Sequence, residues 1–220
     1  MFPPQADAEL VCALEDVLEV YHRPFDERRP LVCLDEASRQ LIGETVRPWP
    51  PQPGQPQRYD YEYVGNGTAN LFMVCEPLLG WRAVQVTQRR TARDFAEVLR
   101  WLVEEVHPDA LKVVLVLDNR NRHQLASLSE AFPAEQARRM ARRLEIHYTP
   151  KHGSWLNMAE IELRVLGRQC LNRRIEDLEA MRRQVAAWEE DRNERGIEVQ
   201  WRFTTADARI KLRRLYPSVQ

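Results

Sequence analysis

The segment KVVLVLD, residues 112–118, decides the fold class of this 220-residue chain. Its aliphatic run is too continuous for a strand with one face in water, so we expect a strand that is covered on both faces. Sheets with such strands carry helices on both sides. The run ends in an acid, Asp118, and an earlier apolar run, Leu31–Leu34, also ends in an acid, Asp35. The sequence therefore predicts an α/β domain in which two buried strands each end in an aspartate.

Hydrophobic periodicity places the other elements around these two strands. Helical spacing predicts helices over residues 7–21, 91–106, 133–143, 157–171 and 175–193, with Asp7 and Thr91 as N-caps. β-Rich composition predicts strands over residues 59–64, 69–75, 81–88 and 144–148, broken by glycine-containing turns at 65–67 and 77–80. The proline-rich residues 47–57 form a loop. This order predicts a mixed sheet in which an antiparallel meander precedes parallel strands, flanked by helices.

Composition excludes several classes of protein. Charged residues make up 30% and hydrophobic residues 44%, as in an ordinary globular chain. No apolar run approaches the roughly 18–20 residues that span a bilayer, and no secretory signal opens the sequence, so we expect no membrane partner. Four dispersed cysteines indicate buried thiols of a reduced, cytoplasmic protein. These are Cys12, Cys33, Cys75 and Cys170.

The net charge of −1 conceals a difference between the two parts of the chain. Residues 138–220 hold 18 Lys+Arg against 12 Asp+Glu, whereas residues 1–137 hold 14 against 21. A basic C-terminal third attracts polyanions, and an acidic first part holds cations. The preference for Arg over Lys fits either a GC-rich genome or phosphate recognition. The arginines within residues 164–183 form either a phosphate-tracking face or a solvated helix with acidic partners.

The stretch EIHYTPKHGSWLNMAEIE, residues 145–162, adds a third acidic position. A strand leads into a loop, and a helix begins near Asn157 with Glu160 in its first turn, where the helix dipole alone would favour an acid. Glu160 and Glu162 lie about 200° apart on a helix, so only one of them can face a common site. The aspartates likewise either converge near the strand ends or only bond the turns that follow.

Three motifs together resemble a known family: LVCLDE, LVLDN followed by Asn121 and His123, and HYTPKHGSWLNMAEIE. They are similar to the DDE transposases of bacterial insertion sequences, in particular to the IS-six-thirty group of the mariner superfamily. The resemblance covers nearly the whole chain, and the third motif is the specific one. It implies a ribonuclease-H-like fold that cuts and rejoins DNA with two divalent ions, Mg²⁺ or Mn²⁺.

Carried over residue by residue, the resemblance implies that Asp35, Asp118 and Glu160 are the catalytic and metal-binding acids. Three clustered carboxylates suit this, because each pair 4 Å apart repels by about 4 kcal/mol at an effective dielectric constant near 20 and needs cations nearby. The 41 residues between Asp118 and Glu160 exceed the spacing in eukaryotic mariner relatives, and we place the extra length in residues 127–143. Arg122 stands where relatives commonly have a small hydroxyl residue.

Other residues near the acids are expected to contact DNA or support the site. The expected DNA contacts are Lys151, His152, Trp155 and Arg122. The expected supporting residues are Asn119, His123 and Asn157. The alternatives are that Trp155 packs in the core, that Lys151 is a solvated loop charge, and that His123 and His152 only bond the backbone.

We expect residues 1–30 to be a helical linker and residues 31–220 a catalytic domain with basic C-terminal helices. The helix-turn-helix region usual in the family is not expected within this sequence, so a separate helix-turn-helix chain is an expected partner besides DNA. A homodimer is expected on DNA. Three hypotheses follow: a bacterial transposase, a ribonuclease-H-like nuclease without strand transfer, and a catalytically silent fragment that binds DNA or a partner transposase.

Overall fold

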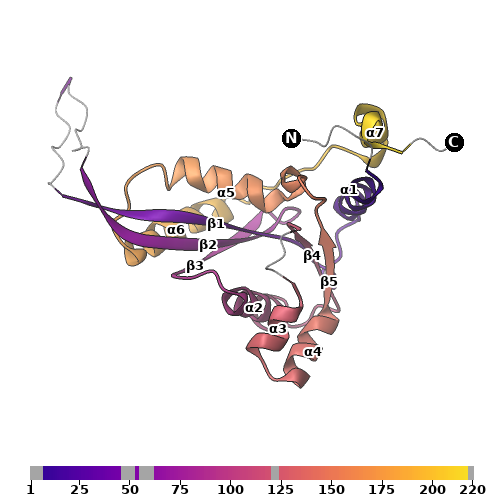
Figure 1. The fold of residues 1–220 in the computed structure, drawn as a ribbon, viewed down its shortest axis with the longest axis horizontal. Helices are drawn as coiled ribbons and strands as arrows, with labels where there is room; N and C mark the ends of the chain where they lie inside the picture. Colours follow the sequence, from indigo (N-terminus) through magenta and orange to yellow (C-terminus); the bar gives the residue numbers. More distant parts are fainter. Residues whose placement is uncertain (1–6, 46–52, 55–61, 120–123, 218–220) are drawn as a thin grey trace.

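The computed structural model describes residues 7–45, 53–54, 62–119 and 124–217, and its centre is a five-stranded sheet (Figure 1). The strands are β1 (Leu31–Glu44), β2 (Tyr63–Glu76), β3 (Trp81–Thr87), β4 (Val113–Leu117) and β5 (Leu144–Tyr148). They lie in the order β3-β2-β1-β4-β5. β1, β2 and β3 pair antiparallel, and β4 pairs parallel with both β1 and β5. The predicted mixed sheet is confirmed.

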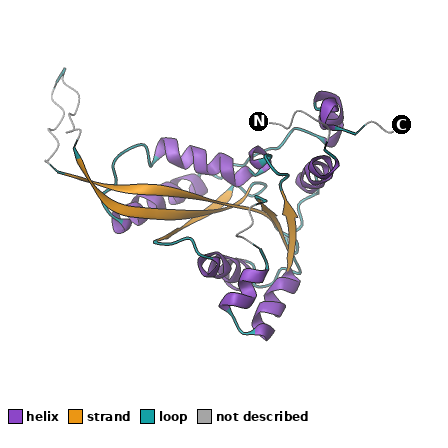
Figure 2. Ribbon diagram, viewed as in Figure 1, coloured by secondary structure: helices purple, strands orange, loops and turns teal. Residues whose placement is uncertain are grey.

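Helices cover both faces of this sheet (Figure 2). They are α1 (Ala8–Tyr21), α2 (Ala92–Trp101), α3 (Ala126–Ala131), α4 (Ala134–Arg143), α5 (Met158–Gln169), α6 (Leu178–Glu194) and α7 (Thr205–Lys211). In Figure 1, α5 and α6 lie over one face and α2, α3 and α4 lie under the other. Asp7 caps α1, and Thr91 forms a capping box with Asp94 at the start of α2, so both predicted N-caps are confirmed.

Each face of the sheet has its own hydrophobic core, because successive side chains of a strand point to opposite faces. Cys33, Val114 and Val116 belong to the core under α1, α5 and α6. Leu34, Leu115 and others belong to the core over α2 and α4. All five residues of β4 are buried, as the apolar run in the sequence predicts.

The expectation that Asp35 ends its strand is wrong. β1 continues to Glu44, nine residues beyond Asp35, because it keeps pairing with β2 after its other neighbour has ended. β4 pairs only with the first part of β1, Leu31 to Leu34. Asp35 therefore lies within β1 at the point where β4 stops, and only Asp118 follows the last residue of its strand.

The predicted break at residues 65–67 is also wrong. β2 runs through these residues without interruption, although the predicted strand residues 59–61 lie outside the described part. The β1–β2 register shifts between Gln40 and Ile42, opposite this point. Gly67 has φ 99°, which a residue with a side chain rarely adopts. The glycines thus make a β-bulge instead of a turn.

Smaller differences concern the helices and the cysteines. The predicted helix 91–106 changes at Leu102 into a π-helical turn that ends at Val106. α3 and α7 were not predicted. Cys12 is exposed and contradicts the expectation of four buried thiols, whereas the other three are buried. None of the helices within the described residues has the length and apolar character that crossing a bilayer requires.

Candidate active site

Asp35 and Asp118 lie side by side on adjacent parallel strands. Leu34 of β1 is in register with Leu117 of β4, and each aspartate is the next residue along its own strand direction. Neighbouring strands are about 4.8 Å apart, so this register alone brings the two residues together. Both acids also line one small pocket, together with Phe72 and Phe95. The structure therefore unites the first two predicted acids.

The side-chain alternation of β1 directs Asp35 towards the face that α5 covers. Cys33, two residues earlier, is buried in the core beneath α5, and residues two apart on a strand share a face. Val116 has the same relation to Asp118 on β4. Asp35 is largely buried, and its Oδ1 accepts a 2.8 Å hydrogen bond from the Glu36 backbone N–H.

Thr149 orients the second aspartate, and the sequence prediction missed it. Its hydroxyl donates a 2.8 Å hydrogen bond to Asp118 Oδ1, and its backbone N–H donates to the Leu117 carbonyl at 2.9 Å. The residue is completely buried. Its position directly after β5, the neighbour of β4, was the available signal, because parallel strands that end together bring the residues after them close to each other.

Asn157 fixes the start of α5 against β1. Its side-chain oxygen accepts a hydrogen bond from the Ala159 N–H at 3.1 Å, and its Nδ2 donates to the Leu34 carbonyl at 2.9 Å. Leu34 directly precedes Asp35, so the first turn of α5 is bonded to the backbone that carries the first acid. Glu160 belongs to that first turn.

The two acids of α5 have different surroundings. Glu160 Oε1 accepts a 2.7 Å hydrogen bond from Arg164, and its Oε2 is buried without a hydrogen-bond partner among the described residues. Glu162 is almost inaccessible and forms ion pairs with Arg192 at 2.9 Å and with Arg82 at 3.4 Å. The charge of Glu162 is therefore already neutralised by two arginines, whereas Oε2 of Glu160 can still bind a cation.

The donor set fits a hard divalent cation. Within the described residues, no group of three or more His, Cys, Asp and Glu side chains converges closely enough to enclose a metal ion. Mg²⁺ does not need such a cage, because it is commonly held by one or two carboxylates while waters and substrate phosphates complete its shell. Asp35 and Asp118 are two such carboxylates on adjacent strands, and Glu160 has one buried oxygen without a hydrogen-bond partner among the described residues.

The other predicted site residues differ in their exposure and contacts. Lys151 and His152 are exposed in the turn before α5, and Asn119 is exposed after Asp118. The Trp155 ring stacks on Trp201, with centroids 6.1 Å apart. This contact agrees with the alternative that Trp155 packs within the protein. Arg122 and His123 lie outside the described residues.

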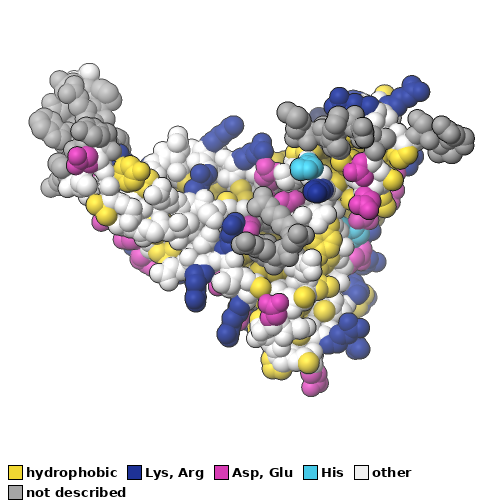
Figure 3. Space-filling model, viewed as in Figure 1, with side chains coloured by type: hydrophobic (Ala, Val, Ile, Leu, Met, Phe, Trp, Pro, Cys, Tyr) yellow, Lys and Arg dark blue, Asp and Glu magenta, His cyan; other side chains and the backbone are white. Residues whose placement is uncertain are grey.

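The arginines within residues 164–183 largely have acidic partners. Arg174 pairs with Glu44 at 2.7 Å, and Arg182 and Arg183 both lie 3.9 Å from Glu179. Figure 3 shows Lys and Arg side chains dispersed among acidic ones over this face of the molecule, without one continuous basic surface. These contacts agree with the solvated-helix alternative.

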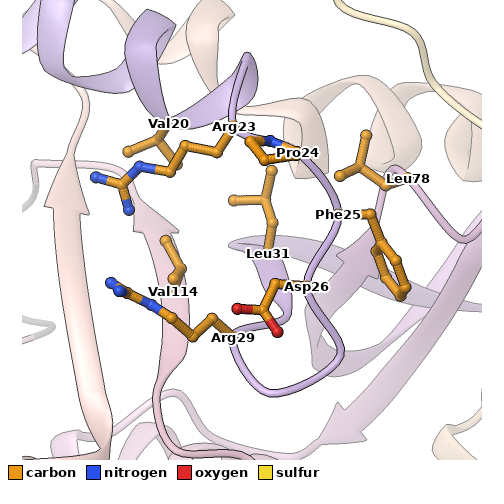
Figure 4. A pocket seen from close by; sticks show the side chains of 9 residues that line it. All are labelled: Val20, Arg23, Pro24, Phe25, Asp26, Arg29, Leu31, Leu78 and Val114. Carbon is orange, nitrogen blue, oxygen red and sulfur yellow. The ribbon is translucent and has the colours of Figure 1, made fainter.

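A larger pocket, of about 330 Å³, lies near the opposite end of the parallel strands (Figure 4). Val114, near the start of β4, lines this pocket, whereas Asp118 follows the end of the same strand. The pocket is therefore separate from the candidate site. Its two arginines, Arg23 and Arg29, both bind Glu145. Burial opposes ionisation of Glu145, but hydrogen bonds from Arg23, His147 and Arg29 outweigh it and lower its pKa to about 2. This pocket does not contain the candidate acids.

Comparison with known proteins agrees with this architecture. A family model described as a DDE superfamily endonuclease matches residues 30–182. The Mos1 mariner paired-end complex with Mg is similar, with a TM-score of 0.56 and 15% identity over 99% of this chain and 66% of that one. The paired-end complex with Mn gives a TM-score of 0.52 and 16% identity over 90% and 61%. The Mos1 strand transfer complex gives 0.56 and 15% over 90% and 60%.

At these identities the likeness concerns the fold, and it confirms the predicted ribonuclease-H-like architecture. The chain spans between 60% and 66% of the length of these three solved chains. A search of the curated proteins found no match.

Proposed function

The chain belongs to the DDE superfamily endonucleases, and from that premise we propose that it is a metal-dependent DNA transposase of the IS-six-thirty branch of the mariner superfamily. The observation that carries the proposal is the β1–β4 register, which sets Asp35 beside Asp118 while Asn157 bonds α5 to the residue before Asp35. A nuclease or transposase activity follows from the family. Our proposal adds two points to that activity: the chain also carries out strand transfer, and it belongs to the mariner branch.

In this proposal Asp35, Asp118 and Glu160 hold two Mg²⁺ or Mn²⁺ ions. When bound, two such ions activate the attacking oxygen and stabilise the leaving oxygen of a phosphodiester. The similar Mos1 structures include complexes with Mg and with Mn, which supports divalent ions for this chain as well. Water first cleaves the phosphodiester at the element end, and the freed 3′-hydroxyl then attacks target DNA by the same displacement.

The protein's own side chains prepare the site for this chemistry. Thr149 holds Asp118 in one orientation, and Asn157 holds the turn that carries Glu160. Arg164 neutralises part of the charge of Glu160, which would be one of the residues that hold the metal. We assign Lys151 and His152, both exposed beside α5, to the DNA phosphates. Trp155 and Arg122, the latter outside the described residues, remain proposed DNA contacts. Asn119 and His123 remain proposed supporting residues of the site.

We place the catalytic domain at residues 31–220 and the linker at residues 1–30. Leu14, Val17 and Leu18 of α1 are buried in the core beneath α5, which supports a linker that is fixed to the catalytic domain. We assign recognition of the element ends to a helix-turn-helix region outside these 220 residues, and synapsis of the two ends to a homodimer on DNA in the bacterial cytoplasm.

Cleavage of duplexes that carry the element's own ends tests the proposal. We expect Mn²⁺- or Mg²⁺-dependent nicking by the wild type, together with a helix-turn-helix chain where one is encoded nearby. Asp118→Asn and Glu160→Gln should remove nicking while the far-ultraviolet circular dichroism stays unchanged. Asp109→Asn, which alters an exposed acid elsewhere, is the matched control.

The products separate the three candidate functions. Joined element-target DNA supports transposition, and nicking without joined products favours a nuclease without strand transfer. DNA retention without metal-dependent nicking, in a folded wild-type protein, would favour the catalytically silent fragment. Equal nicking by the wild type and Asp118→Asn would contradict the assignment of Asp118.

A further inference from the structure

Helix α5 takes part in a buried ion network that the proposed chemistry does not use. Glu162 of α5 is 1% exposed and lies between two guanidinium groups. Its Oε1 accepts a 2.9 Å hydrogen bond from Arg192 of α6, and its Oε2 lies 3.4 Å from Nε of Arg82 on β3. The network thus joins the helix that carries Glu160 to a second helix and to an edge strand of the sheet.

Arg82 is itself fixed from several sides. It is 2% exposed, and its guanidinium donates to the carbonyls of Arg192 at 2.9 Å and of Ile197 at 2.5 Å. Its backbone N–H donates to Oδ1 of Asn193 at 2.9 Å. Burial lowers the pKa of Arg82, and the neighbouring Glu162 carboxylate opposes that shift. Glu162 therefore contacts a guanidinium that is bonded to the backbone at the end of α6.

Stability alone is a weak reason for such a network. Removing charges from water is costly, and well-packed apolar side chains of similar volume often stabilise a core equally well. An ion pair with fixed partners adds directionality, because the carboxylate must point at both guanidinium groups. For a helix, that direction sets the rotation about its own axis.

Rotation of α5 matters because Glu160 and Glu162 are on the same helix. A rotation of about 20° would displace a carboxylate about 6 Å from the helix axis by roughly 2 Å. Metal-binding and catalytic groups need to be held to about 0.5 Å. The Asn157 contact to Leu34 fixes the start of α5, but a contact at one end leaves rotation of the helix less constrained.

We propose that Glu162, held by Arg82 and Arg192, is a positioning residue that sets the rotation of α5 and so directs Glu160 at the metal site. This inference rests on the proposed function, in which Glu160 is a metal ligand. Glu162 acts through the helix and touches neither metal nor DNA. Its side chain lies about 200° around α5 from Glu160, so a restraint on one determines the direction of the other.

The Glu162→Gln variant tests the inference, because it keeps the shape of the side chain and removes its charge. Met140→Ala is the matched control: Met140 is buried in the core on the other face of the sheet, so the variant loses stability without touching α5. The readouts are the Mn²⁺ concentration for half-maximal cleavage and the rise in melting temperature on adding Mn²⁺ alone. Both are measured well below the melting temperature of each variant or normalised to folded protein.

We expect Glu162→Gln to raise the half-maximal Mn²⁺ concentration about tenfold, in the range found when supporting groups of metal ligands are removed. Met140→Ala should leave it unchanged. In a Glu160→Gln background, Glu162→Gln should cause no further loss of the Mn²⁺-induced rise in melting temperature, since the two residues act through one ligand. If Glu162→Gln does not fold, Arg192→Lys, which keeps the charge and loses the planar fork, is measured in the same way.

An unchanged Mn²⁺ requirement in folded Glu162→Gln, or equal changes in Glu162→Gln and Met140→Ala, would overturn the inference and leave the proposed function intact. The proposed function fails separately, if the wild type shows neither metal-dependent cleavage nor a metal-induced rise in melting temperature.

Discussion

The Thr149 hydroxyl donates a 2.8 Å hydrogen bond to Asp118 Oδ1 from a position with no solvent exposure. A buried threonine has few rotamers, and the backbone bond from its N–H to the Leu117 carbonyl fixes it further. The Thr149 hydroxyl therefore fixes Oδ1 of Asp118. Because the carboxylate is planar and rigid, the position of Oδ2 is restricted as well. Groups that hold ligating carboxylates in this way tune metal sites.

We predict that Thr149→Val lowers DNA cleavage by about 10- to 100-fold, because it removes the hydroxyl at nearly unchanged volume. Thr149→Ser keeps the hydroxyl and should retain most of the activity. Single-turnover cleavage at saturating Mn²⁺ measures the effect, with melting temperatures recorded for both variants. If folded Thr149→Val cleaves DNA at the rate of the wild type, Asp118 does not need the hydrogen bond from Thr149.

For the Arg164–Glu160 pair we predict a gain in metal binding on substitution, in contrast to the loss of cleavage expected for Thr149→Val. The 2.7 Å contact joins residues four apart on α5, and the Arg164 side chain is mostly exposed. Removing such a pair costs at most about 0.5 kcal/mol of stability. Because the guanidinium engages Oε1 of Glu160 and its positive charge repels a cation at Oε2, Arg164→Ala should bind Mn²⁺ several-fold more tightly in the absence of DNA.

Calorimetric titration of Mn²⁺ into the DNA-free protein measures this change. Arg183→Ala is the matched control, since Arg183 lies near Glu179 on a different helix. Weaker Mn²⁺ binding by Arg164→Ala would mean that Arg164 holds Glu160 in its productive position instead of repelling the cation.

Asn157 makes two contacts that substitutions can separate. Asn157→Ala loses both the helix cap, worth about 1 kcal/mol, and the bond to the buried Leu34 carbonyl, worth about 1–3 kcal/mol. Asn157→Ser retains a capping oxygen but is too short to reach Leu34. We expect urea denaturation to show a smaller loss for Ser than for Ala, and cleavage to fall similarly in both.

A different N-cap provides the control for this pair. Asp177 caps α6, because its side chain accepts a 2.7 Å hydrogen bond from the Ala180 N–H, and Asp177→Ala removes this cap. It should lose about 1 kcal/mol of stability without a change in the Mn²⁺ requirement. If Asn157→Ser cleaves DNA as the wild type does, the contact with Leu34 is dispensable for the site.

Much of the fold could be predicted because local patterns and the final packing agree. The fully apolar run of β4, the caps Asp7 and Thr91 and the strand of residues 144–148 each appear as expected. The length of β1 could not be predicted, since Asp35 and the polar residues after it interrupt the apolar run. Pairing with β2 extends the strand there, and that pairing is a long-range property.

The candidate acids could be proposed from their motifs, but their support could not. Thr149 reaches Asp118 only because β4 and β5 are parallel neighbours, and Glu162 meets Arg82 across a separation of 80 residues in the chain. The helical angle does predict that Glu160 and Glu162 face different surroundings. Which of them faces the arginines depends on the packing of α5 against the rest of the domain.

The buried Glu76 predicts an unusual dependence of stability on pH. Glu76 ends β2, lies 3.4 Å from the His107 imidazole, and burial raises its pKa to about 7 from an ordinary value of 4.5. Between these values the folded chain holds a proton that the unfolded chain releases. The contribution of this carboxyl to stability is therefore full below about pH 4.5, declines as the pH rises to about 7, and stays low above it.

Glu76→Gln replaces the acid by a neutral group of the same shape and removes this decline. Relative to the wild type, the variant should gain about 1–3 kcal/mol of unfolding free energy between pH 5 and pH 8, as measured by urea denaturation at both values. Glu15→Gln is the control of opposite sign, because the hydrogen bond from Arg209, despite some burial, lowers the pKa of Glu15. Its carboxylate stabilises the fold above its unfolded pKa, so Glu15→Gln should lose stability at pH 8. Parallel pH profiles for the wild type and Glu76→Gln would mean that Glu76 is already ionised in the folded protein at pH 5.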